Sequence, residues 1–209
     1  VTLKDSRGVQ KIENAFGSIT VDNIAGEIVA RNSNGSVNID GVRGMASVTN
    51  RFGSIEVSDV SGPATIANTN GSVQINDIVG ALAVVNAFRT VDVNDVGGPG
   101  SVTNKDGKVE INDVARDVTV NNSFGTIFAA GVGGKLELTG QNSRIDARDV
   151  KGSADVTTSF ATVTLRGIGG TARVTNANGA VQLSEVTGDT TVRTTFGSVV
   201  LKEVRGSID

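Results

Sequence analysis

An eighteen-residue repeat fills the whole chain, and its register constrains the fold more than any other feature. Phe88 recurs at steps of thirty-six residues in both directions, and short polar residues occupy the midpoints. The phenylalanines of this column are Phe16, Phe52, Phe88, Phe124, Phe160 and Phe196. The polar midpoints are Asn34, Asn70, Asp106, Asn142 and Asn178. The step is therefore eighteen residues, and two steps form a thirty-six-residue unit.

Each repeat contains two short alternating segments. When its positions are counted from Gly17, positions 3 and 5 are apolar, as in Ile55 and Val57, and positions 12 and 14 repeat the pattern, as in Val118 and Val120. Alternation with period two predicts half-buried strands. Position 8 is Ile or Val in every repeat after the first, and Gly recurs at positions 1 and 10. Each repeat therefore reads strand, bend, strand, bend, with Gly where the chain turns.

The pattern predicts an all-β fold, a single-stranded parallel β-helix (β-solenoid) of about twelve eighteen-residue coils in one domain, residues 1–209. Strands of three to five residues without long crossovers can pair with the same strand of the next coil. Left-handed β-helices also use eighteen-residue coils, but they place an aliphatic residue at every sixth position. Position 2 holds serines instead, such as Ser18 and Ser36. We therefore expect a right-handed coil.

The amino-acid composition excludes several classes of function. The chain has no His and no Cys, which removes the commonest general base, disulfides and thiolate metal sites. Its charges are interspersed and net −3, so we expect no nucleic-acid partner. No apolar run is long enough to span a membrane. No nucleophile elbow or phosphate loop occurs, so we expect no cofactor and no enzyme. A carbohydrate-active enzyme is a distant alternative, because Glu56, Asp92 and Glu110 share the outward position 4.

Two polar columns are candidate sites. Position 16 carries Asn14, Asn32, Asn50, Asn68, Asn86, Asn104 and Asn122, for which we expect a structural corner with each amide bonded to the next. Position 7 carries Asp59, Asp77, Asp95 and Asp113 on successive coils. Carboxylates about 5 Å apart repel, so this column either binds Ca²⁺ or accepts backbone N–H bonds in a turn while solvent screens its charge. We favour the turn and expect no metal.

The Phe column has two interpretations as well. Rings two coils apart would lie about 9.6 Å from one another, too far to stack as a continuous binding stripe. A ring in every coil would overfill one corner, and alternation with Asn or Asp would relieve that crowding. The column is therefore expected to be structural, with its rings buried in the core.

Residues 52–62 and 70–80 carry the clearest form of the unit: Phe-Gly or Asn-Gly, Ser, an alternating strand, Asp followed by Val or Ile, then Gly. This unit resembles the bacterial adhesin-like family of toast-rack β-helix domains, and the resemblance covers essentially the whole chain. It implies a bacterial protein exported to the periplasm or cell surface, with a signal or anchor segment removed, acting in adhesion or envelope-stress signalling. The family has no catalytic residues to transfer.

Two functions follow as expectations. The first is a non-catalytic module for interaction, adhesion or scaffolding, whose side-chain columns face a protein or glycan partner of the envelope. The second is a self-assembling structural protein that pairs through exposed β-helix ends into an end-to-end homo-oligomer, as in the bactofilins.

Overall fold

The computed structural model describes residues 1–209 as an all-β solenoid of about eleven turns, with twenty strands and no helix. Every strand pairs in parallel with the strand one coil away, at an offset of eighteen residues. Val91, for example, lies between Val73 and Val109. The predicted fold class is confirmed.

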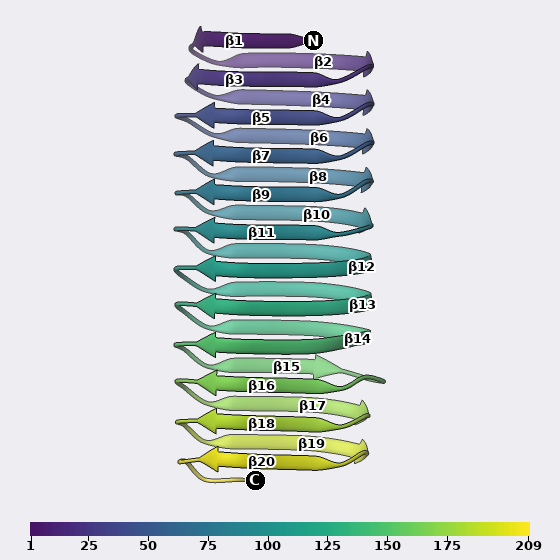
Figure 1. The fold of residues 1–209 in the computed structure, drawn as a ribbon, viewed down its shortest axis with the longest axis vertical. Coiled ribbons are helices and arrows are strands. Elements are labelled where there is room, and N and C mark those ends of the chain that lie inside the picture. The colour runs from purple at the N-terminus through teal and green to yellow at the C-terminus, as the bar shows by residue number, and fades with distance from the viewer.

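The strands form two sheets that face one another, called here the front and back sheets after their places in Figure 1. The front sheet contains β1 (Thr2–Arg7), β3 (Ile19–Ala25), β5 (Val37–Val42), β7 (Ile55–Val60), β9 (Val73–Ile78), β11 (Val91–Val96), β16 (Val163–Ile168), β18 (Val181–Val186) and β20 (Val199–Val204). The back sheet contains β2 (Gln10–Phe16), β4 (Ile28–Asn34), β6 (Ala46–Phe52), β8 (Ala64–Asn70), β10 (Leu82–Phe88), β15 (Ala154–Thr158), β17 (Ala172–Asn178) and β19 (Thr190–Phe196). Three longer strands turn the corner and belong to both sheets: β12 (Gly100–Val114), β13 (Val118–Val132) and β14 (Leu136–Val150).

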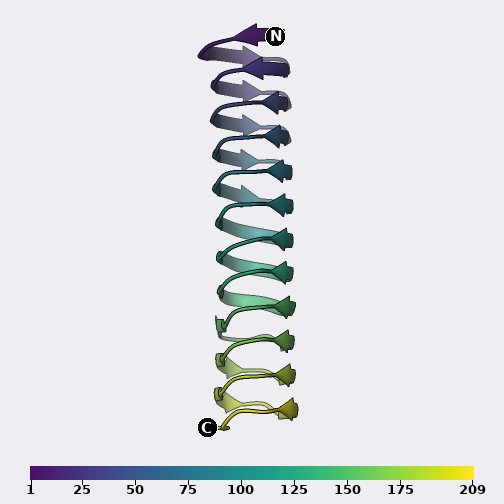
Figure 2. The same ribbon diagram turned by 90° about the vertical axis from the view of Figure 1, so that its left-hand side faces the viewer.

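The coil is right-handed. In Figure 1 the front strands run to the left and the back strands to the right while the chain descends, which is the path of a right-handed screw. Figure 2 shows the same coil from its narrow side, with the N-terminus at one end of the rod and the C-terminus at the other. The structure contains no helix of the length and hydropathy needed to cross a membrane.

The space between the two sheets is filled by aliphatic side chains. Positions 3, 5 and 8 point inward from the front sheet, as Val91, Val93 and Val96 do, while Leu82 and Val84 point inward from the back sheet. They belong to one continuous cluster of 47 buried residues that runs along the rod. Each buried Val, Leu or Ile contributes roughly 1.5–3 kcal/mol relative to an exposed one. The core is thus a stack of nearly identical layers.

A left-handed backbone residue at position 7 explains how positions 5 and 8 can both point inward. This position has φ between 52° and 68° in all coils. The residues that adopt this conformation are Asp5, Asn23, Gly41, Asp59, Asp77, Asp95, Asp113, Gly131, Asp149, Gly167, Glu185 and Glu203. Asp, Asn and Gly tolerate it best among the amino acids. The residue is skipped in the ladder, so each strand continues past it and is longer than the three to five residues expected.

Glycine occupies most positions at the two bends, where the backbone disfavours a side chain. At position 1 the backbone has positive φ, for example 117° at Gly53. At position 10 neighbouring coils approach too closely for a side chain, because a Cβ on Gly62 would lie 2.5 Å from the carbonyl oxygen of Gly44. A Cβ on Gly53 would also lie 2.4 Å from the carbonyl oxygen of Gly35, so position 1 favours glycine by both conformation and contact, and position 10 favours it by contact.

Candidate functional site

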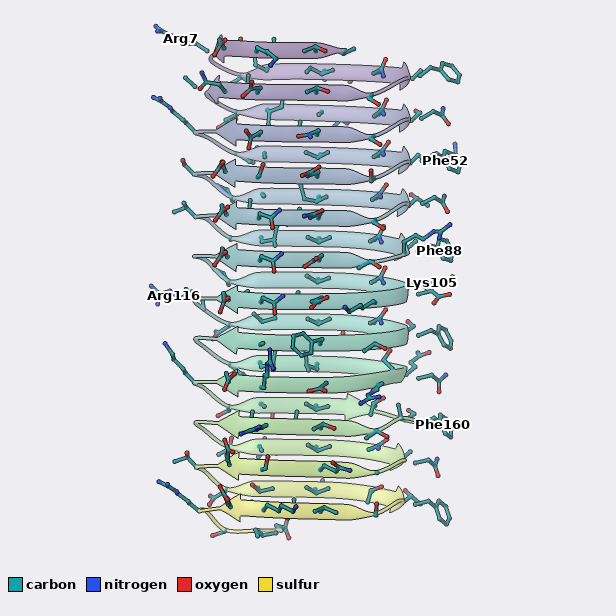
Figure 3. All side chains as sticks on the ribbon, viewed as in Figure 1. Arg7, Phe52, Phe88, Lys105, Arg116 and Phe160 are labelled. Atoms are coloured by element: carbon teal, nitrogen blue, oxygen red, sulfur yellow. The ribbon has the colours of Figure 1, made fainter.

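The Phe column lies on the surface, so the expectation of buried rings was wrong. The side chains range from 41% exposed at Phe88 to 81% exposed at Phe16. Figure 3 shows Phe52, Phe88 and Phe160 projecting from the same edge of the rod. The eleven residues at position 18, the six phenylalanines and the five polar midpoints, are called the Phe edge below. The ladder aligns ten of them, as when Phe88 pairs in register with both Asn70 and Asp106, whereas Phe160 lies beyond the end of β15 and outside the ladder.

The corner interior is occupied by the position 16 asparagine instead of the ring. Asn122 is only 2% exposed, and its Nδ2 donates to the carbonyl oxygens of Phe124 (3.1 Å) and Gly107 (3.0 Å). The chain therefore turns around a small amide that satisfies backbone groups a ring could not. Because the corner is already filled, the position 18 side chain points outward.

The predicted amide ladder at position 16 was also wrong for most of the column. Only Asn14 donates to the amide of the next coil, Oδ1 of Asn32, at 3.0 Å. Elsewhere Nδ2 donates to backbone, as Asn50 does to the carbonyl oxygens of Gly35 and Gly53. In Asn32, Asn50 and Asn122 these bonds use both amide hydrogens, so none remains for a neighbouring side chain. The side-chain oxygens left without a partner are those of Asn50, Asn68, Asn86, Asn104, Asn122 and Asn176.

A short amide ladder does exist at position 6, where sequence reasoning did not look for one. Asn94 donates to Asn76 Oδ1 at 3.1 Å, and Asn112 donates to Asn94 Oδ1 at 3.0 Å. These side chains lie on the front sheet and are half-buried. Three asparagines at successive eighteen-residue steps were the available signal.

At one corner two departures from the repeat pattern compensate for each other. Position 16 is Gly140, and position 1 of the following coil is Ser143 in place of glycine. Ser143 is fully buried, and its Oγ donates to the carbonyl oxygen of Asn122 at 2.8 Å. A Cβ on Gly140 would lie 2.9 Å from Ser143 Cβ. The serine side chain thus takes the corner space that the asparagine occupies in other coils.

The acidic column at position 7 lines an open groove on the opposite corner. Asp59, Asp77, Asp95 and Asp113 border it together with Val60, Ser61, Ile78, Val79, Val96, Gly97 and Ala115, and its volume is about 460 Å³. No group of three or more acidic side chains gathers closely enough to hold a metal ion. The left-handed backbone conformation accounts for the acidic residues at this position.

The acidic residues at position 4 lie on the exterior of the front sheet. Asp92 and Glu110 are neighbours in the ladder, whereas Glu56 lies two coils before Asp92. Asp92 accepts a hydrogen bond from Asn94 Nδ2 at 3.1 Å, and Glu110 forms an ion pair with Lys108. Each of these two carboxylates therefore has a partner within its own strand.

Two exposed ion-pair clusters shift pKa values. The hydrogen bond from Lys11, its positive charge and the nearby Arg31 lower the pKa of Glu13. The hydrogen bond to Asp155 raises the pKa of Lys135. Both clusters lie on the back sheet, so that face carries paired charges.

The Phe edge is the most distinctive exposed feature of the rod. From Phe16 to Phe124 its rings recur on every second coil, separated by short polar side chains in register. Arg51 lies over the Phe52 ring, 5.2 Å from its centre, and Lys105 projects from the same edge (Figure 3). Exposed apolar rings rimmed by polar residues are typical of an interaction surface.

No protein-family model, no curated protein and no solved structure matches this chain.

Proposed function

We propose that the chain is a non-catalytic interaction or scaffold module of the bacterial envelope, which binds through the Phe edge. The observation that carries this proposal is the exposure of all six rings on one edge. Burial inside the narrow coil would have made these residues purely structural. Exposed rings at fixed intervals have no role in the core, and aromatic side chains are enriched among residues that dominate binding energy.

The rest of the proposal has narrower support. Adhesion or scaffolding at the periplasm or cell surface rests on the resemblance of the repeat unit to adhesin-like toast-rack domains. A non-catalytic role is supported by the lack of His and by short corners without the long loops that frame active sites on β-helices. The partner class is a protein or glycan of the envelope.

The test compares two variants of the purified chain with the wild type: a triple variant of the Phe edge and a double control variant. The edge variant carries Phe52→Asn, Phe88→Asn and Phe124→Asn, which introduces in three coils the residue type that the alternate coils already carry. The control variant carries Val79→Asn and Val85→Asn, which remove apolar side chains 68% and 56% exposed elsewhere on the rod. Circular dichroism establishes that both variants keep the β-helix.

Co-sedimentation with washed bacterial envelope fractions, outer membranes and peptidoglycan sacculi separately, gives the readout. We expect the wild type and the control variant to sediment with one fraction and the edge variant to remain in solution. Equal sedimentation of all three proteins, or no sedimentation of the wild type, would refute the proposed function.

End-to-end assembly is a second candidate, favoured by the terminal coils. Within this chain β1 and β20 each have a ladder partner on one side only. In the coil before the last, the N–H of Val181 donates to Ser198 O of the following coil at 2.9 Å, and Val199 holds the equivalent position in β20. Its N–H thus points along the rod axis at an edge that another β-helix could extend.

Val199→Pro tests this candidate, because it removes that N–H and breaks no bond within the chain. If ends pair, light scattering of the wild type rises with concentration beyond the mass of two copies, and the variant abolishes the rise. Wild-type protein that never exceeds two copies counts against end-to-end assembly.

A further inference from the structure

We infer that the partner of the Phe edge is the Phe edge of a second copy of this chain, bound antiparallel with the two sets of rings interleaved. This inference rests on the part of the proposed function that makes the Phe edge an interaction surface, and it is independent of the envelope partner. Three observations support it: the spacing of the rings, the area they expose, and the charges at the centre of the edge.

The spacing of the rings leaves gaps that fit one more ring. From Phe16 to Phe124 the ladder places Phe and polar residues on alternate coils, so successive rings there lie two coils or about 9.6 Å apart. A partner ring inserted opposite the intervening Asn would lie about 4.8 Å from the ring on either side. Aromatic pairs prefer centroid distances of about 4.5–7 Å. Each inserted ring would therefore contact two rings instead of one.

Symmetry then selects the antiparallel arrangement. A two-fold axis along the rod would place every Phe opposite the same Phe of the partner, so the rings would meet head-on. A parallel pair shifted by one coil would interleave, but its repeated contact is heterologous and does not close. A two-fold axis perpendicular to the rod interleaves the rings and closes as a dimer. It must pass between Asp106 and either Phe88 or Phe124, so that all but the outermost rings are matched.

The exposed area is sufficient for a stable pair. The six rings are between 41% and 81% exposed, which amounts to on the order of 700 Å² per copy at roughly 200 Å² per side chain. Specific interfaces bury about 800 Å² per partner. The Asn and Asp side chains between the rings and the Arg51 side chain over Phe52 add the remaining contact.

The charges at the centre of the edge also fit this arrangement. Lys105 and Asp106 are adjacent and both exposed. The perpendicular axis brings Lys105 of one copy within about one to two coils of Asp106 of the partner, in two symmetric places. Opposite charges therefore face each other where the axis crosses the edge, and this favours the central register over a slipped one.

Sedimentation equilibrium over a wide concentration range tests the association. We expect the wild type and the Val79→Asn/Val85→Asn variant to form dimers with similar dissociation constants. The Phe52→Asn/Phe88→Asn/Phe124→Asn variant should raise the dissociation constant on the order of 100-fold or more. A monomeric wild type, or an unchanged constant in the edge variant, would overturn the inference.

Spin labels on single cysteines test the orientation, and the chain is suited to this because it has no cysteine of its own. Ser33 and Ser123 occupy the same position in different coils, next to the Phe edge. In the antiparallel dimer two labels at Ser123→Cys lie one to three coils apart along the rod. Two labels at Ser33→Cys lie seven to nine coils apart, about 34–43 Å at 4.8 Å per coil. Short distances at both sites would show a parallel pair and overturn the antiparallel assignment.

The two proposals fail separately. If the chain is monomeric but the edge variant loses envelope binding, the second copy is excluded and the proposed function stands. If the dimer forms through the Phe edge but envelope sedimentation is the same for all variants, the inference stands and the envelope-binding role does not.

Discussion

The corner formed by Gly140 and Ser143, which replace the usual Asn and Gly, allows a test of which side chain fills each corner. In most other coils, such as that of Asn122 and Gly125, an asparagine fills the corner and a glycine follows three residues later, whereas here the serine fills it. Restoring Asn alone, in Gly140→Asn, should overpack the corner, because the new Cβ would lie 2.9 Å from Ser143 Cβ. We expect a cost of about 1–3 kcal/mol in the free energy of unfolding.

Ser143→Gly alone should also destabilise the chain. It removes the buried hydrogen bond from Ser143 Oγ to Asn122 O, worth about 1 kcal/mol, and adds the backbone entropy of a glycine, about 0.5–1 kcal/mol. The double variant recreates the ordinary Asn and Gly corner and should unfold at nearly the wild-type denaturant concentration. The coupling energy between the two sites is then the sum of the two single costs, about 2.5–5 kcal/mol, at or above the upper end of the 0.5–3 kcal/mol typical of residues in contact.

Chemical denaturation followed by circular dichroism provides the four stabilities of the cycle. Repeat proteins can lose cooperativity, so hydrogen exchange of the amides in β13 and β14 supplies a local measurement at the same corner. As a control, Gly140→Asn combined with the distant exposed substitution Lys202→Ala in β20 should be additive. If the Gly140→Asn/Ser143→Gly double variant is as unstable as the sum of its singles, the two residues do not share the corner and the reasoning is refuted.

Three other predictions concern single positions. Asn122→Ala should destabilise the chain by about 1–3 kcal/mol, because it leaves corner carbonyls without their donor. Substitution of its exposed neighbour, Asn121→Ala, should change stability by less than about 0.5 kcal/mol in the same denaturation assay. Equal effects of the two substitutions would contradict the corner role of Asn122. Arg89→Gly should raise the melting temperature by a few degrees, since Arg89 holds φ at 85°, a conformation that costs a non-glycine residue about 1–2 kcal/mol; a lower melting temperature would show that its side chain stabilises the corner. Lys11→Ala should raise the pKa of Glu13 in an NMR titration, because it removes the hydrogen bond and the positive charge that lower this pKa most. The lowered pKa stabilises the fold above the unfolded-state pKa, and this stability is lost as pH falls through the folded-state pKa. An unchanged pKa would mean that Arg31 alone is responsible.

Part of this structure could be predicted from the amino-acid sequence. A strict eighteen-residue offset means that Val73, Val91 and Val109 must share a column if the chain coils once per repeat, and parallel ladder pairing then requires no further information. The alternation at positions 3 and 5 identified the inward face, because a half-buried strand needs apolar residues on one side only. The jump from position 5 to position 8 also marked a change of parity, which the left-handed residue at position 7 produces.

The orientation of the Phe edge was decided only by tertiary structure. Periodicity shows that Phe88 and Asn86 each recur down the rod, but both lie at the same corner, and the space there admits one inward side chain. The asparagine occupies it because its amide bonds the turn carbonyls, as Asn86 Nδ2 does to Phe88 O at 2.9 Å. A buried ring would have left those carbonyls without a donor, at a cost comparable to the gain from burial. That competition between hydrogen bonding and hydrophobic burial turned the rings outward and made the edge a candidate site.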